Sequence, residues 1–205
     1  MANNKSKNES RAVANALLKH EFILKAIRKP LDENGKLNYT NNHCIMSESD
    51  KGTLDFVTTM LISKVTSLCK GKTNVCIAGS SFTGVLFAEK IAIYADLKFH
   101  NLITGNAFAL EENSFVVIIE DIFGLNQESI HDAKRLKELG HTANDIVCIY
   151  NYDLEDINTS FQANNISVHA LTNSKTLLNQ ALKNKFISDT EYQKTNSVFQ
   201  KINIS

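Results

Sequence analysis

The sequence predicts an α/β fold in which helices flank both faces of a largely parallel sheet. Short apolar strands alternate with amphipathic helices through the middle of the chain, which is the pattern of consecutive β-α-β units. The predicted strands are almost continuously apolar, as expected where helices cover a parallel sheet on both faces. With 205 residues, the chain is long enough for one sizeable core of this kind.

We expect one domain over residues 1–205, because no linker, low-complexity block or internal repeat interrupts the chain. The core sheet is expected within residues 71–171. The flanking segments 1–70 and 172–205 are predicted to be helical and to pack as a second layer, and the first of them includes a small N-terminal hood.

Helical segments are predicted on both sides of the sheet. From about Glu9 to Arg28, apolar residues recur at helical spacing, and Pro30 ends the pattern. The stretch SESDKGTLDFVTTMLISKVTSLCKG predicts a helix with an acidic first turn and with Gly71 as its stop. Two helical pieces finish the chain, and the last is expected to start at Ser188, where Glu191 completes a capping box.

The predicted sheet begins with the strand Val75–Ala78, which runs into a Gly/Ser/Thr turn and an amphipathic helix. A second buried strand, Phe115–Glu120, leads through a short turn to a helix from about Asn126 to Leu139, which Gly140 closes. DIVCIYNY and ISVHAL are interpreted as a third and a fourth strand. We expect the first two strands and Ile146–Ile149 to be adjacent in the sheet.

Charge and composition exclude several classes of function. Lys plus Arg and Asp plus Glu each number 22, so no overall basic field would attract nucleic acid or an anionic membrane surface. No apolar signal region follows the polar N-terminus, and no apolar run is long enough to span a membrane. Cys44, Cys69, Cys76 and Cys148 form no C-x-x-C pair, so we expect a reduced, cytoplasmic protein without a metal site built from its own side chains.

The strand Phe115–Glu120 ends in two adjacent acids, Glu120 and Asp121. In open α/β sheets, ligands bind outside the carboxyl ends of the strands. The N-terminus of the following helix offers free N–H groups to a phosphate, and carboxylates accept hydrogen bonds from ribose hydroxyls. This pattern favours a phosphorylated sugar as ligand. A helix cap and an acidic metal site are the alternative interpretations.

The residues around this acidic pair resemble a known family. VVIIEDIFGLNQES is similar to the phosphoribosyl-diphosphate (PRPP) signature of type I phosphoribosyltransferases. Its Glu-Asp pair resembles the form of this signature found in the orotate branch of the family. NVCIAGSSFTGVLFAEKIA resembles the first strand, pyrophosphate loop and following helix of that family. The tail LTNSKTLLNQALKNKFISDTEYQKTNSVF is similar to the C-terminal helices of bacterial orotate phosphoribosyltransferases. The resemblance implies a Rossmann-like parallel sheet with a small N-terminal hood.

The resemblance also implies roles for individual residues. Glu120 and Asp121 would contact the ribose hydroxyls of PRPP as the catalytic pair. The loop around the 5′-phosphate would comprise Phe123, Gly124, Leu125, Asn126, Gln127 and Glu128. The turn Gly79–Gly84 would contact the pyrophosphate side, although its residues equally suit a turn without a ligand; the candidates are Ser80, Ser81, Thr83 and Gly84. The family uses Mg²⁺ that bridges diphosphate and ribose oxygens, and its homodimers share catalytic loops.

The chain also departs from the family pattern. Two Thr and a Gly usually follow the acids, but Gly124, Leu125 and Asn126 stand there, and Glu128 would oppose a phosphate. The basic mobile loop is shortened by roughly ten residues. Lys98 and His100 are what remains of it, or they are surface residues at a strand edge. No Arg follows the third strand, where the family has one that contacts orotate.

Three functions therefore remain open. The first is an orotate phosphoribosyltransferase, which joins PRPP and orotate to give orotidine 5′-monophosphate and pyrophosphate in pyrimidine biosynthesis. The base that the enzyme would accept, orotate or another nucleobase, is left open as well. The second function is a divergent relative that binds a nucleotide or PRPP and no longer transfers. The third is a partner subunit of an active paralogue. A complete basic loop would favour the enzyme, and its truncation favours the other two.

Overall fold

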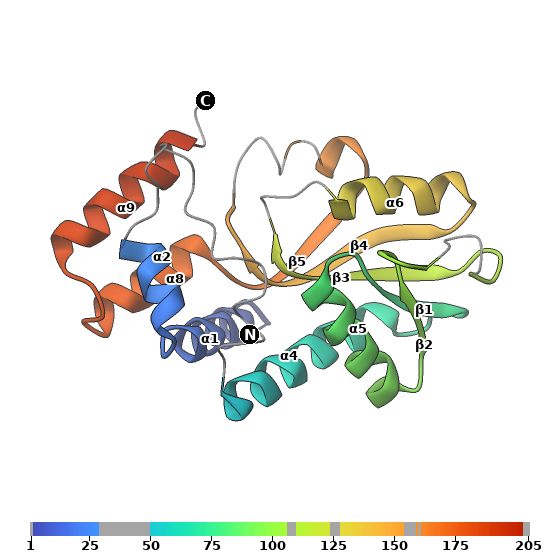
Figure 1. The fold of residues 1–205 in the computed structure, drawn as a ribbon, viewed down its shortest axis with the longest axis horizontal. Coiled ribbons are helices and arrows are strands. Elements are labelled where there is room, and N and C mark those ends of the chain that lie inside the picture. The colour runs from blue at the N-terminus through green and yellow to red at the C-terminus, as the bar shows by residue number, and fades with distance from the viewer. Residues whose placement is uncertain are drawn as a thin grey trace.

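The computed structural model of the chain describes residues 2–28, 50–105, 110–123, 128–153, 159 and 161–202. Their strands form one parallel sheet of five strands in the order β2-β1-β3-β4-β5 (Figure 1). The bounds are β1 (Val75–Gly79), β2 (Lys98–Asn101), β3 (Phe115–Phe123), β4 (Thr142–Asn151) and β5 (Ser167–Asn173). The predicted parallel sheet is confirmed, and its three predicted central strands, β1, β3 and β4, are neighbours.

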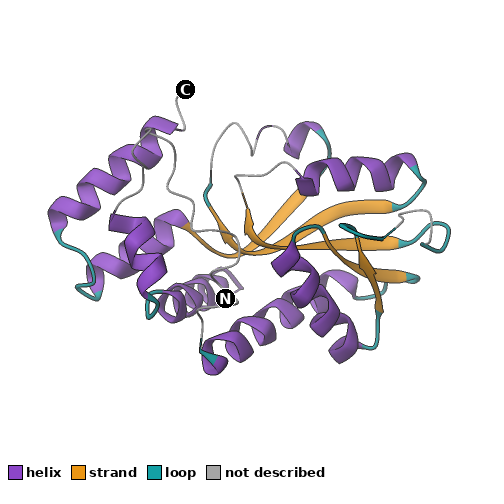
Figure 2. Cartoon of the chain, viewed as in Figure 1, coloured by secondary structure: helices purple, strands orange, loops and turns teal. Residues whose placement is uncertain are grey.

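Helices cover both faces of the sheet and one of its ends (Figure 2). On one face, α4 and α5 pack against the strands, and on the other face lies α6. Beyond the carboxyl ends of the strands lie α2, α8 and α9, and α1 connects them to the rest of the fold because it packs against α8, β5 and α4. The bounds are α1 (Ala2–Leu17), α2 (Glu21–Arg28), α4 (Lys51–Cys69), α5 (Phe82–Ala95), α6 (Glu128–Glu138), α8 (Ser174–Lys183) and α9 (Asp189–Ile202).

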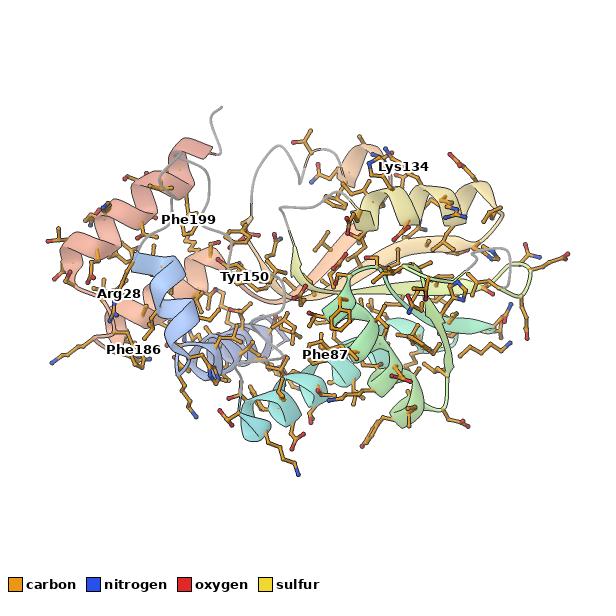
Figure 3. All side chains as sticks on the ribbon, viewed as in Figure 1. Arg28, Phe87, Lys134, Tyr150, Phe186 and Phe199 are labelled. Carbon is orange, nitrogen blue, oxygen red and sulfur yellow. The ribbon has the colours of Figure 1, made fainter. Side chains whose placement is uncertain are left out.

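The alternation of side chains along the strands creates two hydrophobic clusters, one on each face of the sheet. Val117 and Ile119 of β3 contribute to the cluster under α4 and α5, where Phe87 is fully buried (Figure 3). Val116 and Ile118 contribute to the cluster under α6. Because both faces of β3 are dry, its sequence is apolar at every position up to the acids. None of the helices in the described part of the chain is long and apolar enough to cross a membrane.

The N-terminal helical segment differs from the prediction in two ways. Its first helix starts at Ala2 instead of Glu9, and the segment is broken between α1 and α2. At the break, the amide of His20 donates a hydrogen bond to the carbonyl of Leu17, three residues earlier. This 3₁₀-type spacing replaces the four-residue spacing of the α-helix and ends α1. The carbonyl of His20 then accepts from the amides of Ile23 and Leu24 and starts α2. Pro30, the predicted stop, lies outside the described residues.

The first turn of α4 was expected to be acidic, but it contains no acid. The acidic residue lies one position earlier, because Asp50 is the N-cap and its Oδ1 accepts from the amide of Thr53 at 2.9 Å. Gly71 follows the end of the helix with a positive φ of 74°, as a C-terminal stop requires.

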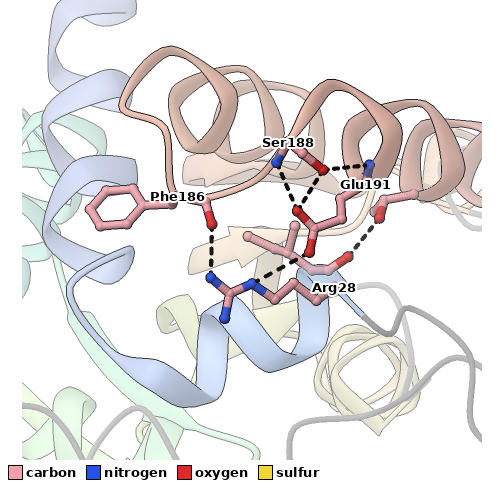
Figure 4. A network of polar contacts seen from close by, with 6 residues as sticks. Arg28, Phe186, Ser188 and Glu191 are labelled. Carbon is pink, nitrogen blue, oxygen red and sulfur yellow. Dashed lines mark hydrogen bonds and ion pairs between the residues drawn. The ribbon is translucent and has the colours of Figure 1, made fainter.

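The capping box at the start of α9 is confirmed. The backbone N–H of Ser188 donates to Glu191 Oε2 at 2.7 Å, and the backbone N–H of Glu191 donates to Ser188 Oγ at 3.3 Å. Arg28 links this cap to α2, because its guanidinium lies 3.7 Å from Glu191 and donates to the carbonyl of Phe186 at 2.9 Å (Figure 4). The hydroxyl of Thr195 donates to the carbonyl of Ile27 at 2.6 Å. These contacts fasten the C-terminal helix to the N-terminal layer.

The strand and helix ends near the acidic pair also required correction. β3 continues to Phe123, three residues beyond the predicted end at Glu120, so Asp121 also belongs to the strand and does not follow it. α6 begins at Glu128, two residues later than expected. The additional pairing of β3 with β4, up to Phe123 opposite Asn151, extends the strand.

Candidate functional site

The acidic pair lies at the carboxyl ends of two neighbouring parallel strands. In the register of β1 and β3, Gly79 is paired with Ile119, so Glu120 comes next to the turn that follows β1. Both acids are buried: the exposed fraction is 5% for Glu120 and 1% for Asp121. Buried carboxyl groups at a sheet edge are costly unless their surroundings compensate them. The contacts of Glu120 are therefore informative.

The turn after β1 supplies hydroxyl groups to the acid on β3. Ser80 Oγ donates a hydrogen bond to Glu120 Oε1. Ser81 also hydrogen-bonds to Glu120 and serves as the N-cap of α5, where its Oγ accepts from the amide of Gly84 at 3.0 Å. The structure thus brings Ser80, Ser81 and Gly84 next to the part of β3 that carries Glu120 and Asp121.

Gly84 is needed because α5 passes very close to β3. A Cβ atom at this position would lie 2.3 Å from the carbonyl oxygen of Ile119. The neighbouring Thr83 is buried, so its side chain packs beneath the turn and is not exposed to solvent. Phe82, by contrast, is 62% exposed, although it is the first residue of α5. An exposed aromatic ring beside the Ser80–Ser81 turn is a site feature that sequence reasoning did not single out.

Burial raises the pKa of Glu120 from 4.5 to about 7. The hydrogen bonds from Ser80 and Ser81 act in the opposite direction, and the nearby carboxylates of Asp121 and Glu128 raise the pKa further. A cation that enters the site would favour the charged form of Glu120 and lower its pKa again.

Further acids, which the sequence analysis missed, lie near this edge. Asp153 is half-buried just after β4, and burial raises its pKa. Its charge, together with those of Glu120 and Asp121, raises the pKa of the buried Cys148 thiol, for which burial is the larger cause. Asp132 on α6 has a pKa raised to about 6, chiefly by burial, which Arg135 opposes and Glu128 reinforces. The only signal for Asp153 in the sequence is its place after an apolar strand.

The excess of acids bears on which ligands the site can hold. Carboxylates suit ribose hydroxyls and Mg²⁺, and they repel phosphate. Among the residues that the structure describes, no group of three or more His, Cys, Asp or Glu could hold a metal ion. Mg²⁺ is usually held in proteins by one or two carboxylates together with substrate phosphates. Glu120 and Asp121 fit that role for an ion that arrives with a diphosphate.

Lys98 and His100 lie on the edge strand β2 and not in a loop. Lys98 forms an ion pair with Glu111, and its Nζ donates to Asn74 Oδ1 at 3.3 Å. His100 is half-buried next to Gly105, and burial lowers its pKa, with His141 as a second cause. β2 was not expected, because its four residues, Lys-Phe-His-Asn, carry no strand pattern.

Most of the predicted phosphate loop, residues 124–127, lies outside the described residues. The two ends of this segment are placed. Phe123 is the last residue of β3, and Glu128 is the exposed first residue of α6. Glu128 acts on the pKa of both Glu120 and Asp132, so the end of the loop does reach the acidic pair.

Sequence comparison finds relatives that are all orotate phosphoribosyltransferases. The chain is 28% identical to that of Coxiella burnetii over 130 residues, which are 58% of this chain and 61% of the relative. It is 35% identical to that of Halalkalibacterium halodurans over 85 residues, which are 42% of this chain and 40% of the relative. The matches thus span less than two thirds of the length of these relatives. No protein-family model matches the chain.

Structural comparison gives the same fold class over more of the chain. Leishmania donovani UMP synthase superposes with a TM-score of 0.69 at 15% identity and covers 94% of this chain and 42% of its own. Orotate phosphoribosyltransferase from Francisella tularensis superposes with a TM-score of 0.60 at 14% identity, over 83% of this chain and 86% of its own. At such low identities the likeness establishes the fold.

Proposed function

We propose that this chain, which has the type I phosphoribosyltransferase fold and resembles orotate phosphoribosyltransferases in sequence, binds PRPP and transfers its phosphoribosyl group to orotate. The observation that carries the proposal is the placement of Glu120 and Asp121. They are buried near the carboxyl end of β3, where the neighbouring strand β1 ends, beside a Ser-rich turn at the start of α5. A cytoplasmic role in pyrimidine biosynthesis follows from this proposal.

The proposed reaction is a displacement at the anomeric carbon of the ribose. A bond forms between a ring nitrogen of orotate and this carbon, while the bond from the carbon to the diphosphate oxygen breaks. The ring nitrogen loses its proton, which is taken up by the released pyrophosphate or by water. Pyrophosphate leaves with the electron pair. Glu120 and Asp121 would accept hydrogen bonds from the ribose hydroxyls, and their charge would stabilise the oxocarbenium-like ribose. Mg²⁺, when bound, would supply positive charge to the diphosphate beside Glu120 and Asp121.

The state of Lys98 favours a second candidate function, which is PRPP binding without transfer. A departing diphosphate needs cations, yet Lys98 is engaged with Glu111 on β2. The sequence from Asp96 to Asn106 has no other Lys or Arg, and neither has the segment 151–158 after β4. Transfer would then require cations from a second subunit. We therefore propose a homodimer for the active form.

Two measurements on the full chain test these proposals in order. Calorimetric titration with PRPP and Mg²⁺ should give saturable binding, and its absence at millimolar ligand would exclude both functions. A pyrophosphate-release assay with orotate should then give turnover that depends on orotate. Binding without release would assign the chain to the second function. Release with another nucleobase, and not with orotate, would keep the transferase and change its substrate.

A further inference from the structure

A basic groove is lined by side chains other than those of the acidic pair. It has a volume of about 940 Å³ and is formed by α1, α4, the edge strand β5 and the first turns of α8. Among the described residues, those that line the groove belong neither to β1 or β3 nor to the Ser80–Ser81 turn. The proposed PRPP site and this groove therefore use different side chains.

Positive charge is in excess in the groove, although the net charge of the whole chain is zero. Among the described residues that line the groove, Glu9 is the single acid, against five cations: Lys5, Lys7, Arg11, Lys64 and Lys175. Lys5 lies 3.9 Å from Glu9, at a spacing of one helical turn. The other four cations have no carboxylate within ion-pair distance among the described residues.

The cations lie close together because α1, α4 and α8 each have a basic residue on the face that lines the groove. On α4, Met60, Ser63, Lys64 and Ser67 follow the spacing of a single helix face. On α1, Lys7 and Arg11 are one turn apart, an arrangement of like charges that weakens a helix by about 0.2–0.5 kcal/mol. A bound anion would remove that repulsion.

The groove also contains hydroxyl groups, which can donate hydrogen bonds to a ligand. The hydroxyl groups that line the groove are those of Ser6, Ser10, Ser63, Ser67 and Thr176. The groove also takes in the start of α8, where Asn173 caps the helix by accepting from the amide of Thr176 at 2.9 Å. The positive end of a helix dipole adds to the attraction for anions. The described residues that line the groove include no aromatic side chain on which a nucleobase could stack.

We propose that this groove is a second ligand site, which binds a small molecule that carries several phosphate groups. The volume is within the usual range for small-molecule sites, about 300–1,000 Å³. Lysine ammonium groups and hydroxyls bind phosphate oxygens as point charges and donors. Four cations without ion-pair partners match a chain of phosphates better than a single phosphate.

Calorimetric titration of the full chain with inorganic triphosphate tests the proposal. We expect saturable binding that is tighter than for orthophosphate and weakens with added salt. The double variant Lys64→Gln/Lys175→Gln should weaken it by about tenfold, because two charge-assisted contacts are lost. Lys134→Gln removes one positive charge from an exposed position on α6, on the other face of the sheet, and should change little (Figure 3).

Other outcomes would overturn the proposal. Absence of saturable binding below millimolar triphosphate would do so, provided that thermal melting shows the chain to be folded. Asp121→Asn addresses the proposed PRPP site and should leave triphosphate binding unchanged. If it abolishes this binding while the double lysine variant does not, the triphosphate occupies the PRPP site. Tighter binding of a hexaglutamate peptide than of triphosphate would assign the groove to an acidic protein segment instead.

Discussion

Ser80 in the turn after β1 donates a hydrogen bond to Glu120 on β3, although the two residues are 40 positions apart in the sequence. The contact couples the turn that begins α5 to the acidic pair. It also holds the side chain of a buried carboxyl group whose pKa is about 7. The protonation of Glu120 should therefore influence both the stability of the protein and the state of the site.

Glu120→Gln should change how stability depends on pH. The folded pKa, about 7, lies above the ordinary value of 4.5, so the stabilising contribution is complete below pH 4.5 and is lost as the pH rises through 7. At pH 8, the variant should be more stable than the native chain by about 3 kcal/mol, and at pH 4.5 the two should be similar. Urea unfolding at both values measures this, with exposed Glu138→Gln as the control. Equal pH slopes for all three proteins would contradict the prediction.

Asp121→Asn should weaken PRPP binding more than it weakens folding. The substitution keeps the shape of the buried side chain and removes its charge. A hydrogen bond from a ribose hydroxyl to a charged acceptor contributes about 1.5–3 kcal/mol, so the affinity should fall at least about tenfold. Titration with PRPP and Mg²⁺, paired with a thermal melt, separates the effects. A sharp fall in melting temperature with intact binding would make Asp121 a structural residue.

Gly84→Ala should destabilise the packing of α5 on the sheet. The new Cβ would meet the Ile119 carbonyl oxygen at 2.3 Å and Ser81 Oγ at 2.8 Å, and the carbonyl is backbone that cannot rotate away. Overpacking of this kind costs about 1–3 kcal/mol, measured by denaturant unfolding. Gly52→Ala on α4 is the matched control, because its Cβ would meet only the side chain of Asp50, at 3.0 Å. Equal stability of the two variants would count against the close approach.

Homodimer formation should depend on the exposed apolar face of α5. Ile93 and Tyr94 are each 76% exposed near the end of this helix, in a position that a partner could cover. Light scattering at micromolar concentration should give a dimer, and Ile93→Asp/Tyr94→Asp should give a monomer. Lys134→Asp on α6 serves as a control for the added charge. A native chain that is monomeric in this experiment would refute the dimer.

The sequence predicted the features that depend on local pattern. The strands at Val75, Phe115 and Ile146 are apolar on both faces, and the capping box at Ser188 and Glu191 is a short-range signal. The acidic pair was recognisable because it interrupts an apolar run.

Other features depend on tertiary contacts and were missed. The break at His20 leaves the buried face formed by Leu17 and Ile23 intact, so periodicity cannot show it. The contact of Ser80 with Glu120 requires the register of β1 on β3. In the sequence, Asp153 cannot be told from an ordinary acidic loop residue. In the fold, its position after β4 brings it near the other carboxylates. The cations of the basic groove are scattered from Lys5 to Lys175 and meet only in the fold.

The last prediction concerns the negative charge that closes the altered phosphate loop. Glu128 is exposed at the start of α6, and its charge reaches Glu120, so it would oppose a phosphate held between β3 and α6. Glu128→Ser should strengthen binding of PRPP by on the order of 1 kcal/mol, because one partly screened repulsion is removed. Glu138→Ser removes an equal charge at the far end of α6 and should have little effect. Threonines at Gly124 and Leu125 should add to the gain if the loop has the shape found in the family. Calorimetric titration of each variant with PRPP and Mg²⁺ measures the gain, and unchanged affinity in Glu128→Ser would mean that phosphate does not approach this helix.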